Sequence, residues 1–321
     1  MLASPTPMHI PDGFLSFIVA ILLWALAIIP VGYALRRVGR DMNERKVPLM
    51  GVLAAAIFAG QMLNFTVAGG TSGHLMGAAI ATILLGPWAA ILVMTSVVTI
   101  QALIFQDGGL LALGGNIFNM AIVGVAVSYM VYRSVQKFAR GHRWGIYAGG
   151  FLAAWLSIFV VALGVALQLA ISGTSPANIA ILAMGGIHAI IGIGEGLITI
   201  GALSFMLTSR PDFVEAGGEK PIRSGVVWLA GLLLAIALVI ASPLASAHPD
   251  GLEWVAAQGG FLEAAREPVY NLIPDYLLPG ISNQVLATML AGVIGVLIVL
   301  IVASAIAYTQ RAHQSSKSHP E

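Results

Sequence analysis

Residues 285–308 read VLATMLAGVIGVLIVLIVASAIAY, a run of apolar and small residues without a charged side chain. An α-helix rises about 1.5 Å per residue, so a helix of this length crosses the hydrocarbon core of a bilayer, which is about 30 Å thick. Seven further stretches are comparably long and apolar: 14–35, 49–67, 88–105, 110–132, 145–172, 181–207 and 226–244. This pattern predicts a chain that crosses the membrane many times.

The composition excludes a soluble fold. Charged residues make up only 9% of the chain and hydrophobic residues 58%, and the mean hydropathy is +0.92. A typical soluble domain is about 25% charged, and so few charges cannot cover a surface that faces water. The net charge of +1 gives no indication of a nucleic-acid partner. We therefore expect an all-α, polytopic membrane helix bundle that is surrounded by membrane lipid and binds no nucleic acid.

A ninth, shorter apolar stretch, residues 75–86, is predicted to form a tight helical hairpin with the span that follows Gly86-Pro87. The first seven helices have short connections and should form a compact core. A linker rich in proline and glycine, residues 209–224, then precedes two further helices. We expect a seven-helix core over residues 8–214 and an accessory region over residues 215–321, with two transmembrane helices and an extracytoplasmic loop.

Basic residues mark one face of the membrane. In the nine-helix topology, 14 of the 15 lysines and arginines fall on one side, and only Arg266 falls on the other. The positive-inside rule then places the N-terminus outside and the C-terminus inside. This predicts a multi-pass protein of the cytoplasmic membrane, with the acidic stretch 245–284 on the outer face.

Polar residues inside the apolar spans are few and gather in the outer halves of the helices. They are Gln61, Asn64, Gln101, Asn116, Asn119, His188 and Glu195. Polar groups are costly in hydrocarbon, so those that occur there are usually functional. With His74 and Asp107 in the adjacent outer loops, they predict an outward-facing pocket for a small cation. The chain has no cysteine, which excludes thiolate ligands, and imidazole and amide donors favour Ni²⁺, Cu²⁺, Co²⁺ or Zn²⁺.

His188 and Glu195 lie seven residues apart, about two helical turns, and so share one helix face. Two interpretations stay open. The pair either forms a structural hydrogen bond that locks helix packing, or it belongs to the polar pocket.

The most informative motif is Met-His-Ile-Pro-Asp-Gly-Phe-Leu, residues 8–15, directly before the first span. If Met8 is the mature N-terminus, its amine, the deprotonated amide nitrogen of His9 and the His9 Nδ1 close two chelate rings on a metal. One more imidazole, with His74 as the candidate, completes a square-planar set of four nitrogens, which suits Ni(II) or Cu(II). Residues 1–7 would block the amine, so we expect them to be a mis-assigned start or to be removed.

The two Pro-Asp-Gly sequences also have a structural explanation. For Pro11-Asp12-Gly13 we favour a turn in which Asp12 caps the first helix over direct metal ligation. The same interpretation applies to Pro249-Asp250-Gly251.

These motifs resemble a known family. The residue 8–15 motif occurs with Gly-His-Leu-Met-Gly at 73–77, Gln-Asp-Gly-Gly-Leu at 106–110, Gly-Gly-Asn at 114–116 and Gly-Glu-Gly at 194–196. Over roughly residues 8–207 the chain is similar to the CbiM/NikM family, the substrate-binding (S) components of cobalt and nickel energy-coupling-factor ABC transporters. The segment His-Pro-Asp-Gly-Leu-Glu, with its flanking spans, resembles the PDGLE domain that is fused to such components or partners them.

The resemblance implies a metal site at the N-terminus. Its ligands would be the Met8 amine, the His9 amide and imidazole, and His74. Side chains that orient these ligands by hydrogen bonds are expected nearby, and the candidates are Asn64, Gln101, Asp107, Asn116, His188 and Glu195. The metal would be transported substrate, and no cofactor is expected.

Small residues recur every four positions on the second span, at Gly51, Ala55 and Ala59. Such a stripe lets helices approach closely. It is explained either by packing within the bundle or by contact with the transmembrane coupling (T) subunit that the family uses.

The predicted function is uptake of Co²⁺ or Ni²⁺, for cobalamin biosynthesis or nickel enzymes, as the capturing component of an ATP-driven transporter. The sequence has no Walker motif, so ATP hydrolysis would belong to separate ABC ATPase subunits. The alternatives are a stand-alone secondary cation transporter, which would be expected to show repeated halves, and an intramembrane enzyme that uses His188 and Glu195. Cobalt and nickel both remain open.

Overall fold

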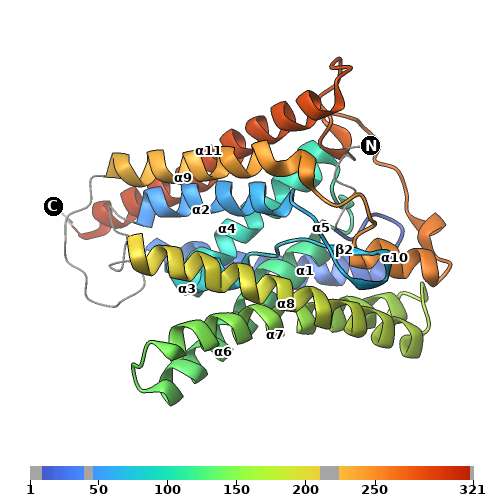
Figure 1. Ribbon diagram of the computed structural model, residues 1–321, viewed down its shortest axis with the longest axis horizontal. Helices are drawn as coiled ribbons and strands as arrows, with labels where there is room; N and C mark the ends of the chain where they lie inside the picture. Colours follow the sequence, from blue (N-terminus) through green and yellow to red (C-terminus); the bar gives the residue numbers. More distant parts are fainter. Residues whose placement is uncertain (1–8, 40–45, 210–223, 319–321) are drawn as a thin grey trace.

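The computed structural model describes residues 9–39, 46–209 and 224–318, and within them the chain is almost entirely helical (Figure 1). Seven helical segments of this part are long and apolar enough to cross a membrane. They are α1 (Phe17–Val38), α4 (Pro87–Ile100) with a π-helical extension (Gln101–Phe105), α5 (Leu113–Asn116) continuing through a π-helical stretch (Ile117–Val123) into α6 (Gly124–Ala139), α7 (Trp144–Ile171), α8 (Ala177–Ser209), α9 (Ser224–Ala241) and α11 (Gln284–Ser318). The all-α membrane fold is confirmed.

Two of the nine predicted helices are shorter than a full crossing. Helix α2 spans Lys46–Gln61 and α3 spans Ala78–Leu85. The predicted hairpin is present, because Gly86 adopts a φ of 83° that favours glycine and Pro87 starts α4. With α3 counted as a separate short helix, the described part of the core contains the seven predicted helices.

The first helix begins later than predicted. The span was expected from residue 14, but α1 starts at Phe17. Residues 9–16 instead form a non-helical segment that leads into this helix. Backbone carbonyls of this segment accept hydrogen bonds from other loops, as Ile10 does from Gly109 N and Asp12 from Arg266 N. In a helix these carbonyls would bond within the helix instead.

Helix α2 is buried almost completely and packs against α9, α11 and α4. An added Cβ at Gly51 would lie 2.0 Å from Ser304 Oγ and 3.2 Å from the Trp228 ring, so glycine is needed for this close approach. Ala55 and Ala59 have no exposed surface. The chain's own C-terminal helices thus cover the small-residue stripe, which fits packing within the bundle and leaves these positions closed to a coupling subunit.

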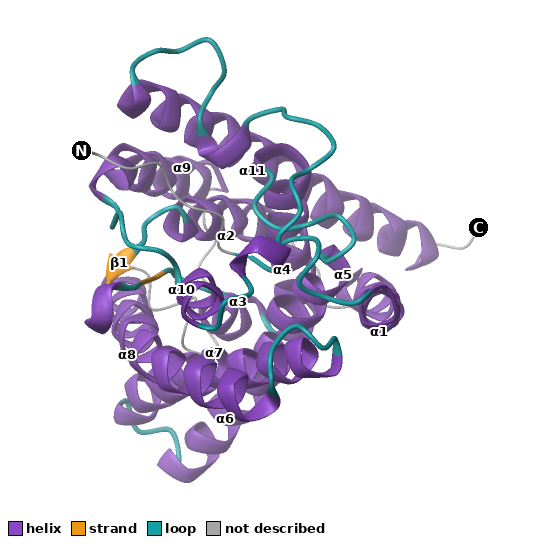
Figure 2. Cartoon of the chain, turned by 90° about the vertical axis from the view of Figure 1, so that its right-hand side faces the viewer, coloured by secondary structure: helices purple, strands orange, loops and turns teal. Residues whose placement is uncertain are grey.

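Loops and short elements close one end of the bundle (Figure 2). Strands β1 (Phe65–Thr66) and β2 (Ser72–Gly73) form a small antiparallel hairpin, and Ser72 forms a parallel bridge with Asp250. The short helix α10 (Gly251–Gln258) follows and lies over the middle of the helix ends. At the opposite end lie the basic α6–α7 turn and the last turns of α11 (Figure 1).

Candidate functional site

His9 is held in place by Asp107. The His9 main-chain N–H donates to Asp107 Oδ1 at 3.1 Å, and His9 Nδ1 lies 3.1 Å from the same oxygen. His9 is 5% exposed. His9 Nδ1 also lies 3.3 Å from the Asp107 carbonyl oxygen, so Asp107 contacts both of these His9 nitrogens.

The neighbouring Ile10 is fixed from the same side. Its N–H donates to Asn116 Oδ1 at 3.0 Å, and its carbonyl accepts from Asn116 Nδ2 at 3.1 Å and from Gly109 N at 3.0 Å. Gly109 is required here, because an added Cβ would lie 2.0 Å from Asp12 Oδ1. The loop 106–116 thus holds the 9–12 segment by both main chain and side chains.

The turn expected at Pro11-Asp12-Gly13 is present, but the expected cap of the first helix by Asp12 is wrong. The N-cap of α1 is Ser16, which makes no side-chain cap bond. Asp12 Oδ1 instead accepts from Ala112 N at 2.9 Å, and the Asp12 carbonyl accepts from Arg266 N at 2.8 Å. It therefore ties loops together. The equivalent expectation for Asp250 is confirmed, since its side chain caps α10 through Gly251 N.

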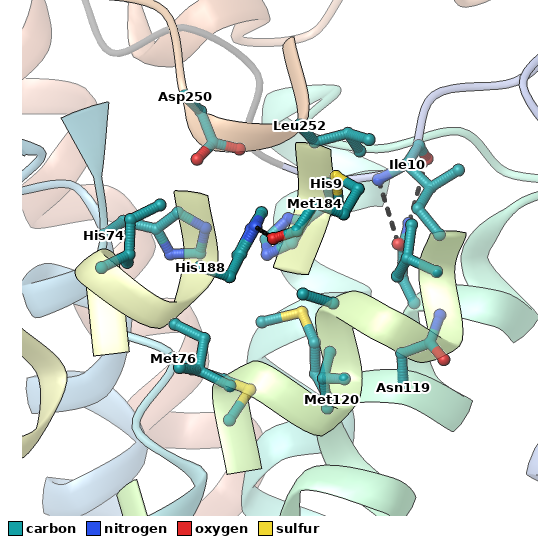
Figure 3. A pocket seen from close by; sticks show the side chains of 16 residues that line it. His9, Ile10, His74, Met76, Asn119, Met120, Met184, His188, Asp250 and Leu252 are labelled. Atoms are coloured by element: carbon teal, nitrogen blue, oxygen red, sulfur yellow. Dashed lines mark hydrogen bonds between the residues drawn. The ribbon is translucent and has the colours of Figure 1, made fainter. Parts of the chain in front are cut away.

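His74 faces the ring of His9, with the ring centroids 5.8 Å apart and nearly perpendicular (Figure 3). Its Nδ1 lies 3.0 Å from the Leu75 carbonyl. An Nδ1–H that donates to this carbonyl leaves Nε2 as the nitrogen with a free lone pair. Burial, and to a smaller extent the charge of His9, lower the pKa of His74 from 6.5 to about 4. His74 is accordingly neutral at physiological pH, as a metal ligand must be.

The pKa of His9 moves the other way. Burial, the largest influence, lowers it, but the charge of Asp107 and the hydrogen bonds to this residue outweigh burial and raise the pKa above its usual 6.5. The two histidines therefore differ in how strongly they hold a proton.

Glu195 fixes the loop that carries His74. Its two carboxyl oxygens accept from Met76 N at 2.8 Å and from Gly77 N at 2.9 Å, and Gln61 Nε2 donates to the Met76 carbonyl at 2.9 Å. His188 does not bond to Glu195; its Nδ1 lies 2.8 Å from the Met184 carbonyl. The structural-pair interpretation of His188 and Glu195 is thus wrong, because each bonds to main chain instead.

A cavity of about 70 Å³ lies beneath the two histidines. Figure 3 shows this cavity, with Asp250 and Leu252 at the top of the view and Met76 and Met120 at the bottom. Its walls comprise His9, Ile10, His74, Met76, Asn116, Asn119, Met120, Ile158, Val161, Ala162, Val165, Met184, His188, Ile191, Asp250 and Leu252. A larger groove of about 980 Å³ also reaches His9 and Leu252. His9 therefore borders both the groove and the smaller cavity.

The segment before α10 covers the cavity. Ser72 N donates to the Pro249 carbonyl at 2.8 Å, and Ser72 Oγ donates to the His248 carbonyl at 2.9 Å. An added Cβ at Gly251 would lie 3.0 Å from His188 Cε1, so the chain approaches α8 closely here. Burial raises the pKa of Asp250 to about 7.

The structure brings most of the predicted residues together. His9, His74, Asn116 and His188 line the cavity, and Asp107 and Glu195 hold the two histidine segments by hydrogen bonds. Gln101 and Asn64 are buried but do not line it. Met8 and residues 1–7 lie outside the described residues.

Sequence reasoning missed three kinds of residue. The methionines that line the cavity, Met76, Met120 and Met184, are apolar and so were not candidates. Asp250 was expected only in a turn, and Tyr276 belongs to a loop without a recognisable motif. Among the described residues, no group of three or more His, Asp or Glu side chains is arranged to hold a metal ion. Side chains alone thus give an incomplete set of donors.

Comparison with known proteins identifies both halves of the chain. Residues 9–213 match the cobalt uptake substrate-specific transmembrane region, CbiM, and residues 225–312 match the PDGLE domain. The chain is 39% identical to the "Putative fused nickel transport protein NikMN" of Archaeoglobus fulgidus, over 91% of this chain and 96% of that protein. It is 30% identical to the fused nickel transport protein NikMN of Rhodobacter capsulatus, over 91% and 95%.

A solved structure shares the core fold. The crystal structure of a truncated transition metal transporter is similar with a TM-score of 0.56 and 32% sequence identity, over 63% of this chain and 99% of that one.

Proposed function

This chain belongs to the CbiM family of cobalt uptake substrate-specific transmembrane regions, and we propose that it captures Ni²⁺ or Co²⁺ at the outer membrane face for ATP-driven uptake. As a member of this family it is a multi-pass membrane transport protein and not an enzyme. Residues 8–214 would bind the metal, and residues 215–321 would form the accessory PDGLE region.

One observation carries the proposal. His9 N and His9 Nδ1, the two nitrogens that would form the six-membered chelate ring, both lie 3.1 Å from Asp107 Oδ1, and Nδ1 also lies 3.3 Å from the Asp107 carbonyl oxygen. The neutral ring of His74 stands next to this residue. Main-chain nitrogens would supply the donors that the side chains lack, namely the His9 amide and the Met8 amine.

Metal binding would change the hydrogen bonds of His9. An amide nitrogen that donates to Asp107 Oδ1 cannot bind a metal through the same position, so its proton must leave and the carboxyl group must move aside. Ligation by four nitrogens in a plane favours nickel over cobalt. Relatives named as nickel transport proteins align with this chain over 91% of its length, which supports the same choice.

The transport step would need partners. The CbiM family is a component of cobalt transport systems, which implies partner proteins. We propose that these partners are a transmembrane T subunit and ABC ATPases. Basic residues at the end of the bundle opposite the site support an outward-facing site. Transport by this chain alone, the alternative, would give metal uptake in cells that lack the partner ATPases; we expect none.

The binding site is tested by metal analysis of the purified full-length protein loaded with Ni²⁺ or Co²⁺. We expect about one metal per chain in the wild type and loss of binding in His9→Ala and in His74→Ala. His142→Ala serves as the control, because His142 is exposed in the turn after α6, and this variant should bind the metal normally. Full binding by both site variants would refute the ligand assignment.

Mass spectrometry of the same protein tests the amine ligand. We expect a mature chain that begins at Met8. A chain that begins at Met1 and still binds one metal would refute the amine chelate, although the two histidine ligands could stand.

A further inference from the structure

Tyr276 reaches the metal site from the C-terminal region. It ends the turn Pro274–Tyr276 between α10 and α11 and has no exposed surface. Its ring stacks on Phe105 with the centroids 4.8 Å apart and an interplanar angle of 16°. Its hydroxyl group donates to Asp107 Oδ2 at 2.6 Å. A hydrogen bond thus joins the outer C-terminal loop to the residue that holds His9.

The backbone around Tyr276 is unusual. Asp275 and Tyr276 have φ values of 52° and 56°, in the left-handed region that side chains other than glycine rarely adopt. Neighbouring contacts hold this loop in place, since Ile273 N donates to the Ile104 carbonyl at 3.0 Å and Tyr270 Oη donates to the Leu103 carbonyl at 2.9 Å. Strained backbone of this kind persists only where the surroundings determine it.

The position of Asp107 is informative about its role. In most metal sites a carboxyl group bonds to the ring nitrogen that does not touch the metal, and so orients the ligand. Here Asp107 Oδ1 lies 3.1 Å from both His9 N and His9 Nδ1, the two proposed donors. His9 Nδ1 also lies 3.3 Å from the Asp107 carbonyl oxygen, so Asp107 contacts both nitrogens that a chelated metal would need.

We propose that Tyr276 is a positioning residue that holds Asp107 between the two His9 donors, so that Ni²⁺ or Co²⁺ must displace this carboxyl group to bind. The inference rests on the proposed function, because it requires His9 to be a ligand. It gives the fused C-terminal loop a specific effect: the Tyr276 hydroxyl group stabilises the metal-free arrangement and opposes metal entry.

Tyr276→Phe tests the proposal, because it removes the hydroxyl group and keeps the stacked ring. The hydrogen bond that is lost stabilises only the metal-free arrangement. We expect the apparent Kd for Ni²⁺ to fall about threefold to tenfold and the association rate to rise, measured on the full-length protein with Ni²⁺ alone. A general structural defect would weaken binding, so tighter binding separates the two explanations.

Tyr270→Phe is the matched control. It removes a similar hydroxyl group from the same loop, but one that bonds to the Leu103 carbonyl and not to Asp107. We expect unchanged Ni²⁺ affinity. In an Asp107→Asn background, Tyr276→Phe should likewise have no further effect, because the proposed action passes through the Asp107 carboxyl group.

Unchanged or weaker Ni²⁺ binding by Tyr276→Phe would overturn the inference and would leave Asp107 as an ordinary orienting partner. An effect of the same size in the Asp107→Asn background would also overturn it. If the wild-type protein binds neither Ni²⁺ nor Co²⁺, the proposed function itself fails, which is a distinct result.

Discussion

The two histidine segments are held in different ways. The His74 loop is anchored from inside the membrane by Glu195 of α8, whose carboxyl group accepts two main-chain N–H groups. The His9 segment is held by Asp107 and Asn116 of the loop region 106–116. A segment fixed by a transmembrane helix cannot easily move, whereas one held by loops can rearrange. We infer that His74 is the fixed half of the site and His9 the adjustable half.

Glu195→Gln should produce the largest effect. The amide can accept only through one oxygen, so one of the two N–H groups of the His74 loop loses its buried partner. We expect Ni²⁺ affinity to fall about 100-fold, measured by calorimetric titration.

Thr199→Val is the control on the same helix, one turn further along. Thr199 is fully buried and its hydroxyl group has no hydrogen-bond partner among the described residues. Normal binding by Glu195→Gln would show that the His74 loop does not depend on this anchor.

Asn116→Ala tests the adjustable half. It removes both Asn116 hydrogen bonds to Ile10, and we expect Ni²⁺ affinity to fall about 30-fold, less than for Glu195→Gln because Gly109 N still donates to the Ile10 carbonyl. Asn64→Ala is the control, since Asn64 Oδ1 has no partner in the described part of the chain. Equal losses in both variants would contradict a specific role for Asn116.

The pH dependence should separate the two histidines. His9 must lose its proton to bind metal, and its pKa is raised above 6.5, so affinity should fall as the pH drops through that raised value. Release of the His9 amide proton lowers the affinity about tenfold per pH unit throughout, and the His9 ring adds about another tenfold per unit below its raised pKa, while His74, with a pKa near 4, stays neutral. Ni²⁺ titrations between pH 8 and pH 5 measure this. A flat profile would contradict proton competition at His9.

Gly251→Ala should have the smallest effect. The added Cβ would lie 2.9 Å from Ile191 Cδ1 and 3.0 Å from His188 Cε1, so the segment that covers the cavity must shift. Overpacking of this kind costs about 1–3 kcal/mol of stability. We expect a lower melting temperature and a change of about threefold in Ni²⁺ affinity, since neither proposed ligand segment is touched. Gly260→Ala, where the new Cβ meets no neighbour but φ is positive, controls for backbone strain.

Much of the fold could be predicted from the sequence. Apolar stretches predicted the helices, and Gly86-Pro87 predicted the break between α3 and α4. The start of α1 could not be predicted from hydropathy, because residues 9–16 are kept out of the helix by hydrogen bonds to loops that are distant in the sequence. The small-residue stripe of α2 was recognised as a close contact, but only packing showed that α9 and α11 provide it.

The sequence by itself determined that the chain is a helical membrane protein and that His9 and His74 are candidate ligands, because length, hydropathy and motif spacing are local properties. Only the tertiary structure decided what holds these residues. Glu195 and Met76 are 119 positions apart, and Tyr276 and Asp107 are 169 apart. Which polar side chain reaches which histidine depends on how the helices pack and where the loops cross, and no local pattern encodes that.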